Sequence, residues 1–275
     1  MNPEPTGAIE LIRPPSGRRP RLALFDFDGT LSLIREGWPD VMIPMMVEIL
    51  SPLKTGLAAE QLRKTVAEDV AQSTGQVTLI QMIRLAERVA EFGGAPLDPR
   101  QYKAEYDRRL RAHIAGRRNG LASGAIAPDA MLLTGAQPML EALASRGVAM
   151  ALASGTDDPD VREEAEVLGV ARFFGPRIYG AKDDYAASGK KRVVERLLAA
   201  SGIAGRDLLV FGDGFVEIEC VKTVGGYAVG VASDEAAGGG RINAWKRERL
   251  LGAGADMIVP DFAGHARLAQ LLLGP

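Results

Sequence analysis

Short apolar runs, each closed by a glycine or a polar residue, recur along this 275-residue chain and constrain its fold more than any other feature. Runs of this length are typical of buried parallel strands. Segments with helical spacing separate the later runs. Strands that alternate with helices predict an α/β protein of three layers, in which helices cover both faces of a parallel sheet. The runs are Leu22–Phe25, Val148–Ala153, Leu208–Phe211, Tyr227–Ala232 and Met257–Val259, with weaker candidates at Ile178–Gly180 and Ala8–Ile12, and the helical segments are Ala136–Ala144, Pro159–Leu168, Val193–Ala200 and Ile242–Leu251.

One interval between runs is much longer than a strand–helix–strand connection requires. Ser154, after the second run, lies 126 positions beyond Asp28, whereas a crossover needs only about a dozen residues. Residues 33–131 show little strand character, and their apolar residues recur at helical spacing. Four amphipathic helices can bury a small core of their own. We therefore expect residues 1–32 and 132–275 to form a core domain, and residues 33–131 to form an all-helical domain inserted after the first strand.

Composition excludes several classes of protein. Apolar residues make up 47% of the chain and charged residues 25%, as in an ordinary globular protein. The net charge of −2 gives no electrostatic reason to expect nucleic acid or an anionic membrane as a partner. The single cysteine, Cys220, excludes an internal disulfide framework. No apolar stretch is long enough to span a membrane and no apolar leader begins the chain, so we expect a cytoplasmic protein.

Polar side chains follow the apolar runs at the points where the predicted strands end. Ligands of an open parallel sheet bind beyond the carboxyl ends of its strands, so these side chains are candidates for one site. Singly, each has an ordinary explanation, because Asp-Gly closes many turns and Ser or Asp often caps a helix. Together, they bring complementary groups from four segments to one edge. They are Asp26, Asp28 and Thr30 after the first run, Ser154 and Gly155 after the second, Asp213 and Glu217 after Leu208–Phe211, and Lys190 before Val193–Ala200.

The residue types at this edge indicate phosphoryl transfer. Carboxylates that converge without compensation repel one another and raise one another's pKa. A hard divalent cation relieves this repulsion, and Mg²⁺ favours a few carboxylate oxygens together with water and substrate phosphate. Lys190 adds a positive charge, and Ser154 with the backbone amides of the following turn supplies donors for anionic oxygens. A site of this kind catalyses by positioning and by neutralising charge.

The same segments resemble the motifs of a known family. Asp26-Phe27-Asp28-Gly29-Thr30 is similar to the DxDGT signature of haloacid dehalogenase superfamily phosphatases. Ser154 resembles the family's second motif and Lys190 its third. Gly212-Asp213, with Glu217, resembles the fourth, so the four motifs occur in the family's order. This resemblance covers nearly the whole chain and implies a Rossmann-like core. The helical insertion resembles the cap of the family's first structural subclass, which phosphoglycolate phosphatase-like members carry.

The resemblance implies a role for each matching residue. Asp26 would be the nucleophile that forms an aspartyl-phosphate, and Asp28 would protonate the leaving alkoxide and then deprotonate the attacking water. The phosphoryl group would be held by Ser154, Gly155 and Lys190. The ligands of Mg²⁺ would be Asp26, the backbone carbonyl of Asp28 and Asp213, with Glu217 in contact with the ion or one layer behind it.

Three of these assignments have rivals. Lys182 and Lys191 compete with Lys190, although Lys190 is better placed to enter the helix that leads to the next strand. Ser154 is also a candidate helix cap, and Glu217 is a candidate capping or solvated carboxylate.

Two residues of the inserted segment are candidates for substrate recognition. Gln76 ends the polar stretch Gln72–Gln76, which is either a substrate loop or an ordinary turn between helices. Thr78 and Gln81, which follow it, are interpreted as a capping box of the next helix. Arg35 lies where the chain enters the insertion, and it is either a contact for an anionic or polyhydroxylated substrate or a solvated charge.

We therefore expect a Mg²⁺-dependent phosphatase that hydrolyses a small phosphorylated metabolite, such as a sugar, polyol or hydroxy-acid phosphate. Aromatic residues are sparse, at 5% of the chain, and offer no base-stacking platform for nucleic acid. The charged cluster Trp245–Arg249 is interpreted as a solvated helix face. Two alternatives stay open, namely a phosphomutase that returns the phosphoryl group to its substrate, and a metabolite-binding sensor without turnover. The oligomeric state is left open as well.

Overall fold

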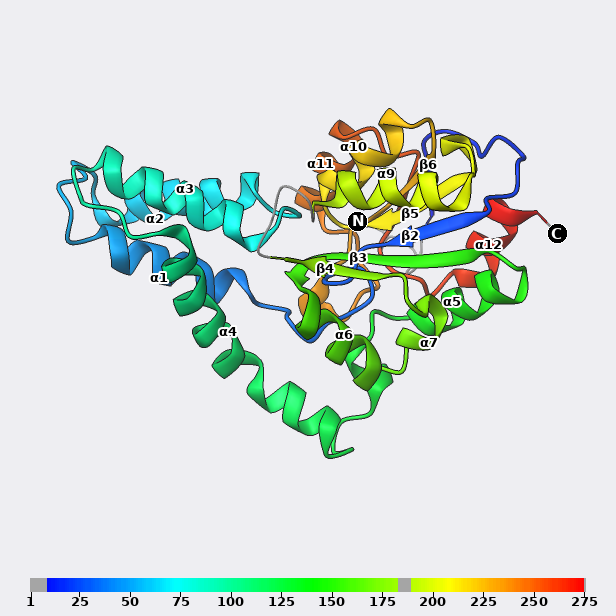
Figure 1. Cartoon of the computed structure of the whole chain (residues 1–275), viewed down its shortest axis with the longest axis horizontal. Helices are drawn as coiled ribbons and strands as arrows, with labels where there is room; N and C mark the ends of the chain where they lie inside the picture. The colour runs from blue at the N-terminus through cyan, green and yellow to red at the C-terminus, as the bar shows by residue number, and fades with distance from the viewer. Residues whose placement is uncertain (1–8, 183–188, 275) are drawn as a thin grey trace, which may run out of the picture.

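The computed structural model describes residues 9–182 and 189–274 and contains a seven-stranded sheet (Figure 1). The strands are ordered β1-β7-β6-β5-β2-β3-β4, with β1 antiparallel to β7 and all other neighbours parallel. The prediction of an α/β fold with a mostly parallel, Rossmann-like sheet is confirmed. The strands are β1 (Glu10–Leu11), β2 (Leu22–Phe25), β3 (Ala149–Asp157), β4 (Ile178–Ala181), β5 (Leu208–Gly212), β6 (Tyr227–Val231) and β7 (Met257–Val259).

Helices cover both faces of the sheet, because successive side chains of each strand enter two different cores. In β2, Ala23 and Phe25 belong to one core, and Leu22 and Leu24 belong to the other. Phe25 stacks on Phe211 of β5 with ring centroids 4.6 Å apart. Figure 1 places α9 (Lys190–Ser201), α10 (Phe215–Thr223) and α11 (Ala244–Gly252) on one face, and α5 (Ala136–Ser145), α6 (Asp158–Val167), α7 (Ala171–Phe174) and α12 (His265–Leu273) on the other.

Four further helices lie between β2 and β3 in the sequence and extend away from the sheet (Figure 1). The first of them contacts the other three, and their facing side chains are apolar and buried, as Met42, Val66, Met82 and Tyr106 illustrate. Each helix therefore hides one face against its neighbours. The helices are α1 (Pro39–Leu50), α2 (Ala59–Gln72), α3 (Thr78–Glu91) and α4 (Pro99–Ala122).

The positions of most predicted elements agree with the structure. The bounds of β2 and β7 match the predicted runs, and β1 lies within the candidate run Ala8–Ile12, whose first residue is outside the described part. β3 continues past Ala153 to Asp157, and α7, α10 and α12 were not predicted. Three short 3₁₀ helices complete the description, at Pro128–Met131, Gly205–Asp207 and Glu235–Ala237. None of the helices in the described ranges combines the length and apolar character needed to cross a lipid bilayer.

Candidate active site

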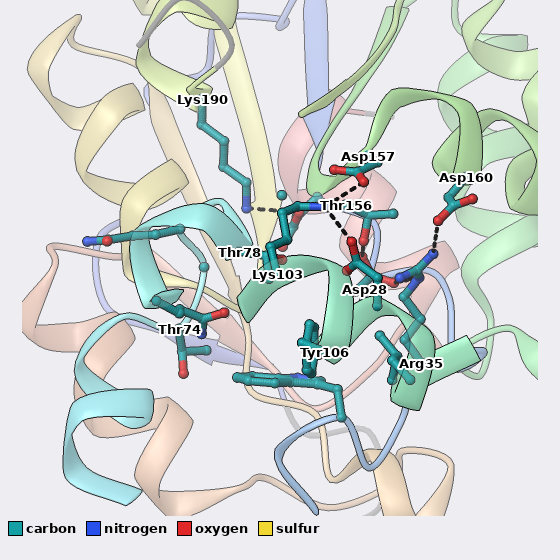
Figure 2. A pocket seen from close by; sticks show the side chains of 18 of the residues that line it. Asp28, Arg35, Thr74, Thr78, Lys103, Tyr106, Thr156, Asp157, Asp160 and Lys190 are labelled. Carbon is teal, nitrogen blue, oxygen red and sulfur yellow. Dashed lines mark hydrogen bonds and ion pairs between the residues drawn. The ribbon is translucent and has the colours of Figure 1, made fainter. Parts of the chain in front are cut away.

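The carboxyl ends of β2, β3 and β5 meet at one edge of the sheet and bring the predicted segments together. Asp26 directly follows β2, Ser154 lies in the last part of β3, and Asp213 directly follows β5. These side chains become neighbours because β2 is hydrogen-bonded to β3 on one side and to β5 on the other. Figure 2 shows Lys190 and Asp28 directed into the same pocket. Residues that are far apart in the sequence thus surround one small space.

Lys190 is the first residue of α9, and its ammonium lies between two carboxylates. The Nζ atom lies 2.9 Å from Asp26 Oδ1 and donates a hydrogen bond of 2.8 Å to Glu217 Oε2. The side chains of all three residues are buried. The rival candidates Lys182 and Lys191 are exposed. Of the three lysines considered from the sequence, Lys190 is therefore the one at the site.

Burial and charge act against each other in this cluster. Burial raises the pKa of Asp26 well above its ordinary value, and Lys190 opposes that rise. Burial alone would lower the pKa of Lys190, but the charges of Asp26 and Glu217 outweigh it and raise the pKa. Lys190 therefore remains a fixed cation beside Asp26.

Glu217, in the first turn of α10, is fixed by hydrogen bonds to both of its oxygens. Oε1 accepts a hydrogen bond of 2.7 Å from the backbone N–H of Gly214, and Oε2 accepts the bond from Lys190. The side chain is 1% exposed, so the expectation of a solvated carboxylate is wrong, whereas the capping alternative describes the bond to Gly214. The oxygens of Glu217, Asp26 and Asp213 nevertheless lie within 4.8 Å of one another.

Asp28 is held by two hydroxyl groups from the end of β3. Its Oδ2 atom accepts hydrogen bonds from Ser154 Oγ at 3.1 Å and from Thr156 Oγ1 at 2.9 Å. Its Oδ1 atom is buried and has no hydrogen-bond partner among the described residues, and the nearest cation is Arg35 Nε at 3.9 Å. Asp28 therefore keeps one oxygen free for a reacting group. The sequence analysis quoted no role for Thr156, although a hydroxyl two residues after Ser154 in an extended strand lies on the same face.

Lys246 is a second buried cation of the site, and the sequence analysis missed it. Its Nζ atom donates hydrogen bonds to Asp213 Oδ2 at 2.8 Å, to Glu235 Oε1 at 2.5 Å and to Ser233 Oγ at 3.1 Å. The side chain is 10% exposed, so the interpretation of Trp245–Arg249 as a solvated face is wrong at this position. The error arose because the charge pattern of α11 does not reveal that one of its turns packs against acidic residues that follow β5 and β6.

The loop after β2 packs so tightly against this second cluster that a side chain at Gly29 has no room. Gly29 has φ +73°, and a Cβ atom there would lie 2.4 Å from Asp213 Oδ2 and 2.9 Å from Glu235 Oε1. Its carbonyl oxygen accepts a hydrogen bond of 2.7 Å from Ser233 Oγ. Glycine is therefore required here both by backbone conformation and by contact. This contact sets the position of Asp28 relative to Asp213.

A cavity of about 100 Å³ opens between this edge and the four inserted helices. The turn between α2 and α3 closes one side of it, because a Cβ atom at Gly155 would lie 2.8 Å from the carbonyl oxygen of Gln76. Gln76 lines the cavity, whose small size suits a compact ligand. The capping box expected for Thr78 and Gln81 is wrong, since Val77 precedes the helix and Thr78 is its first residue.

Arg35 also lines the cavity, but acidic side chains of α6 occupy its guanidinium. It donates hydrogen bonds to Glu164 at 2.8 Å and 3.1 Å. A further bond of 3.3 Å joins it to Asp160 (Figure 2). The side chain is 10% exposed, so the expectation of a solvated charge is wrong. Contact with a substrate, the other alternative for Arg35, stays a prediction.

The donor set fits a hard divalent cation. Five carboxylates face two ammonium groups in this region, and all the candidate ligands are oxygens, which suits Mg²⁺. The buried Oδ1 of Asp28 without a described partner is a further sign of missing positive charge. Both oxygens of Glu217 already accept hydrogen bonds. Asp26 and Asp213 are thus the carboxylates best suited to touch the ion.

A family model independently identifies the class of protein to which this fold and site belong. The model describes a haloacid dehalogenase-like hydrolase, and it matches residues 20–225. Because the match covers most of the chain and all four motifs, the chain belongs to the haloacid dehalogenase-like hydrolase family. The expectation drawn from the DxDGT-like segment is confirmed.

Solved structures share the fold at low sequence identity, while a search of curated proteins finds no match. A predicted phosphoglycolate phosphatase from Haemophilus somnus 129pt is 19% identical, with 91% of this chain and 98% of that chain covered and a TM-score of 0.58. A HAD family hydrolase from Deinococcus radiodurans R1 with bound phosphate and sodium is 18% identical, with 93% of this chain and 98% of that chain covered and a TM-score of 0.54. CbbY from Rhodobacter sphaeroides in complex with xylulose-1,5-bisphosphate is 18% identical, with 89% and 95% covered and a TM-score of 0.57.

Proposed function

We propose that this protein is a Mg²⁺-dependent phosphatase that hydrolyses a small phosphorylated metabolite, such as a sugar, polyol or hydroxy-acid phosphate, through an aspartyl-phosphate. One observation carries the proposal. Asp26 lies beside the fixed ammonium of Lys190, and Asp28, two residues later, is held by two hydroxyls with one oxygen free. A nucleophile, a phosphoryl-binding cation and a separate acid–base group are the parts that this chemistry requires.

In the first half-reaction, a carboxylate oxygen of Asp26 attacks phosphorus. The new O–P bond forms as the ester O–P bond breaks, and a protonated Asp28 gives its proton to the leaving alkoxide. The alcohol departs and the phosphoryl group stays on Asp26. The side chain of Lys190 would offset the charge of the phosphoryl oxygens, and the backbone N–H of Gly155 would donate a hydrogen bond to one of them.

In the second half-reaction, water hydrolyses the acyl phosphate. Asp28, now a carboxylate, takes a proton from the water as its oxygen bonds to phosphorus, and the bond between phosphorus and Asp26 breaks. Inorganic phosphate leaves, and both carboxyl groups return to their starting states. Ser154, whose hydroxyl donates to Asp28, orients this base.

Mg²⁺, held by Asp26, Asp213 and the backbone carbonyl of Asp28, would supply positive charge that offsets the repulsion between the buried carboxylates and the phosphate. Lys190 and Lys246 each pair with two carboxylates and so offset only part of the negative charge of the described residues. The bound cation would favour the ionised, nucleophilic form of Asp26 against the effect of its burial.

The test is release of inorganic phosphate from p-nitrophenyl phosphate by an Asp26→Asn variant. We expect turnover to fall at least roughly 1,000-fold, because removal of a covalent nucleophile abolishes the main route. Asp129→Asn, a change at an exposed aspartate far from the site, is the matched control and should keep wild-type activity. Circular dichroism checks that both variants fold.

A second assay, on phosphorylated sugars and polyols with analysis of all products, separates the alternatives. A phosphomutase would yield a rearranged phosphorylated product in place of free phosphate from its own substrate, and a sensor would bind the phosphorylated metabolite without either outcome. Full activity of Asp26→Asn would contradict the proposed nucleophile.

A further inference from the structure

Besides Lys190 and the carboxylates of the site, the cavity is lined by residues of the inserted helices and their surroundings. The charges and hydrogen bonds of these residues determine which group can be attached to the phosphate of a substrate. We propose that the group carrying the phosphate is an uncharged, polyhydroxylated one, a sugar or polyol, and not a carboxylate, a second phosphate or an amine. This inference rests on the proposed function and narrows its substrate class. We call this part of the cavity the distal wall, formed by Arg35, Gln76, Thr78, Gln81, Lys103, Tyr106, Asp107, Asp157 and Asp160.

The ammonium of the distal wall already has two partners. Lys103, on α4, donates hydrogen bonds to Asp107 at 2.7 Å and to Asp157 at 2.6 Å (Figure 2). Its side chain is 18% exposed, so water screens these interactions only partly. A substrate carboxylate or second phosphate would have to displace one of these carboxylates to reach Lys103, and it would meet their repulsion on approach.

The guanidinium of the distal wall is occupied in the same way. Arg35 binds Glu164 and Asp160, and Arg111 adds a second cation 3.4 Å from Asp160. The carboxylates at this end are therefore paired as well, so a substrate amine gains little from them. Three carboxylates of the distal wall face two cations, so no cation is left unpaired for an anionic group, and each carboxylate already faces a cation.

Neutral polar groups of the distal wall, in contrast, lack partners. The Tyr106 hydroxyl and the Gln81 amide belong to side chains that are 4% and 5% exposed, and neither forms a hydrogen bond with the described residues. The side chains of Thr78 and Gln76 also line the cavity without such a bond. The polar atoms of Tyr106 and Gln81 are not among the buried, unpartnered atoms of the described residues, so they reach the space of the cavity and can bond a ligand or water there.

Hydroxyls and amides each offer donors and acceptors, which is the pattern that a row of alcohol groups matches. A polyol can satisfy Tyr106 and Gln81 together while leaving the ion pairs of Lys103 and Arg35 intact. The distal wall thus favours polyols through hydrogen bonds and disfavours charged groups, because its own charges are already paired.

The first experiment compares substrates of similar size that differ in charge. We expect kcat/KM for glycerol 3-phosphate and erythritol 4-phosphate to exceed that for 3-phosphoglycerate, 2-phosphoglycolate and phosphoethanolamine by at least 10-fold. An equal or higher value for a carboxylate, bisphosphate or amine substrate would overturn the inference. Hydrolysis of p-nitrophenyl phosphate reports on the chemistry alone. If the protein hydrolyses neither the test substrates nor p-nitrophenyl phosphate, the result counts against the proposed function instead.

The second experiment changes the distal wall. Asp107→Asn combined with Asp157→Asn releases Lys103, and we expect the ratio of kcat/KM for 3-phosphoglycerate to that for glycerol 3-phosphate to rise at least 10-fold. An unchanged ratio would contradict the claim that paired charges exclude anionic groups.

Tyr106→Phe tests the hydrogen-bonding half of the inference. Loss of one neutral hydrogen bond should raise the KM for glycerol 3-phosphate about 2- to 10-fold relative to the KM for p-nitrophenyl phosphate. Tyr102→Phe, on the same helix, is the matched control, because its hydroxyl accepts a bond from the backbone of Leu97 and does not line the cavity. A similar relative change in both variants would count against a role in substrate selection.

Discussion

At the scale of single residues, two buried lysines hold the acidic groups of the site in place. Lys190 joins Asp26 to Glu217, and Lys246 joins Asp213 to Glu235. Each ammonium comes from a helix on the same face of the sheet, whereas Asp26 and Asp213 directly follow strands, and Glu217 and Glu235 lie in the first turns of α10 and of a 3₁₀ helix. The carboxylates are therefore fixed before a substrate arrives, which is the condition for electrostatic catalysis without reorganisation.

Replacement of Lys246 by methionine tests this arrangement. The change leaves Asp213 and Glu235 buried without their shared cation, which we expect to lower the free energy of unfolding by about 3–5 kcal/mol. Added Mg²⁺ should raise the melting temperature of the variant more than that of the wild type, because the ion supplies the missing charge. Thermal melts with and without Mg²⁺ measure both effects.

Lys191→Met is the matched control for that prediction, since Lys191 is exposed and should tolerate the change. A melting temperature of Lys246→Met equal to that of the control would show that the ion pairs of Lys246 do not stabilise the fold.

The sequence was sufficient to predict residues whose position follows from their own strand, and insufficient for the rest. Asp26 and Asp213 directly follow apolar runs, so the parallel sheet alone brings them to one edge. Lys246 lies in a charged helix that resembles a solvent-exposed one, and its burial depends on how α11 packs on the sheet. Periodicity within one helix carries no information about such a tertiary contact.

At the scale of elements, strands were easier to predict than helix ends. Buried parallel strands are continuous apolar runs, so the first and last residues of β2 and β7 were predicted correctly. Helix starts depend on side-chain caps, which are harder to identify from the sequence. Thr78 and Gln81 have the spacing of a capping box, but in the structure both residues line the cavity. α7 has four residues and is too short to show a periodicity.

Helix α6 is joined to the segment after β2 by the ion pair of Arg35 and Glu164. Glu164 is 1% exposed, so Arg35→Met would leave its carboxylate buried and unpaired. We expect a loss of about 3–5 kcal/mol in the free energy of unfolding, measured by urea denaturation. The double variant Arg35→Met with Glu164→Met should recover part of this loss, because the most deeply buried carboxylate is removed together with its partner. Equal stability of the single and double variants would contradict the pairing.

At the scale of the whole molecule, the inserted helices contact the core at several places. Ion pairs join α4 to Asp157 at the end of β3, through Lys103, and to Glu163 of α6, through Arg118. Arg249 of α11 donates to the carbonyl oxygen of Ala71 at the end of α2, and the turn between α2 and α3 lies against Gly155. The cavity lies between the core and these helices. The contacts could not be predicted from the sequence, because pairs of exposed-looking charges have many possible partners.

Mg²⁺ binding should stabilise the assembled molecule, because the unfolded chain has no converging carboxylates. At a tenfold excess of Mg²⁺ over its dissociation constant, the gain is about 1.4 kcal/mol, or roughly 3–6 °C in melting temperature. EDTA should remove the gain and suppress phosphatase activity. Asp213→Asn should lose most of the gain in melting temperature, and a full shift in that variant would exclude Asp213 as a ligand.

The position of the insertion also has a consequence for synthesis on the ribosome. β2 pairs with β3 and β5, and the residues of α1–α4 are translated before either partner exists. At ordinary rates of translation, the delay between the end of β2 and the end of β5 is roughly ten seconds or more. The inserted helices can pack during this interval, whereas the apolar β2 segment stays without a sheet. The nascent chain therefore passes through a stage in which β2 is a target for chaperones, and the site forms only late in synthesis, once β5 has left the exit tunnel.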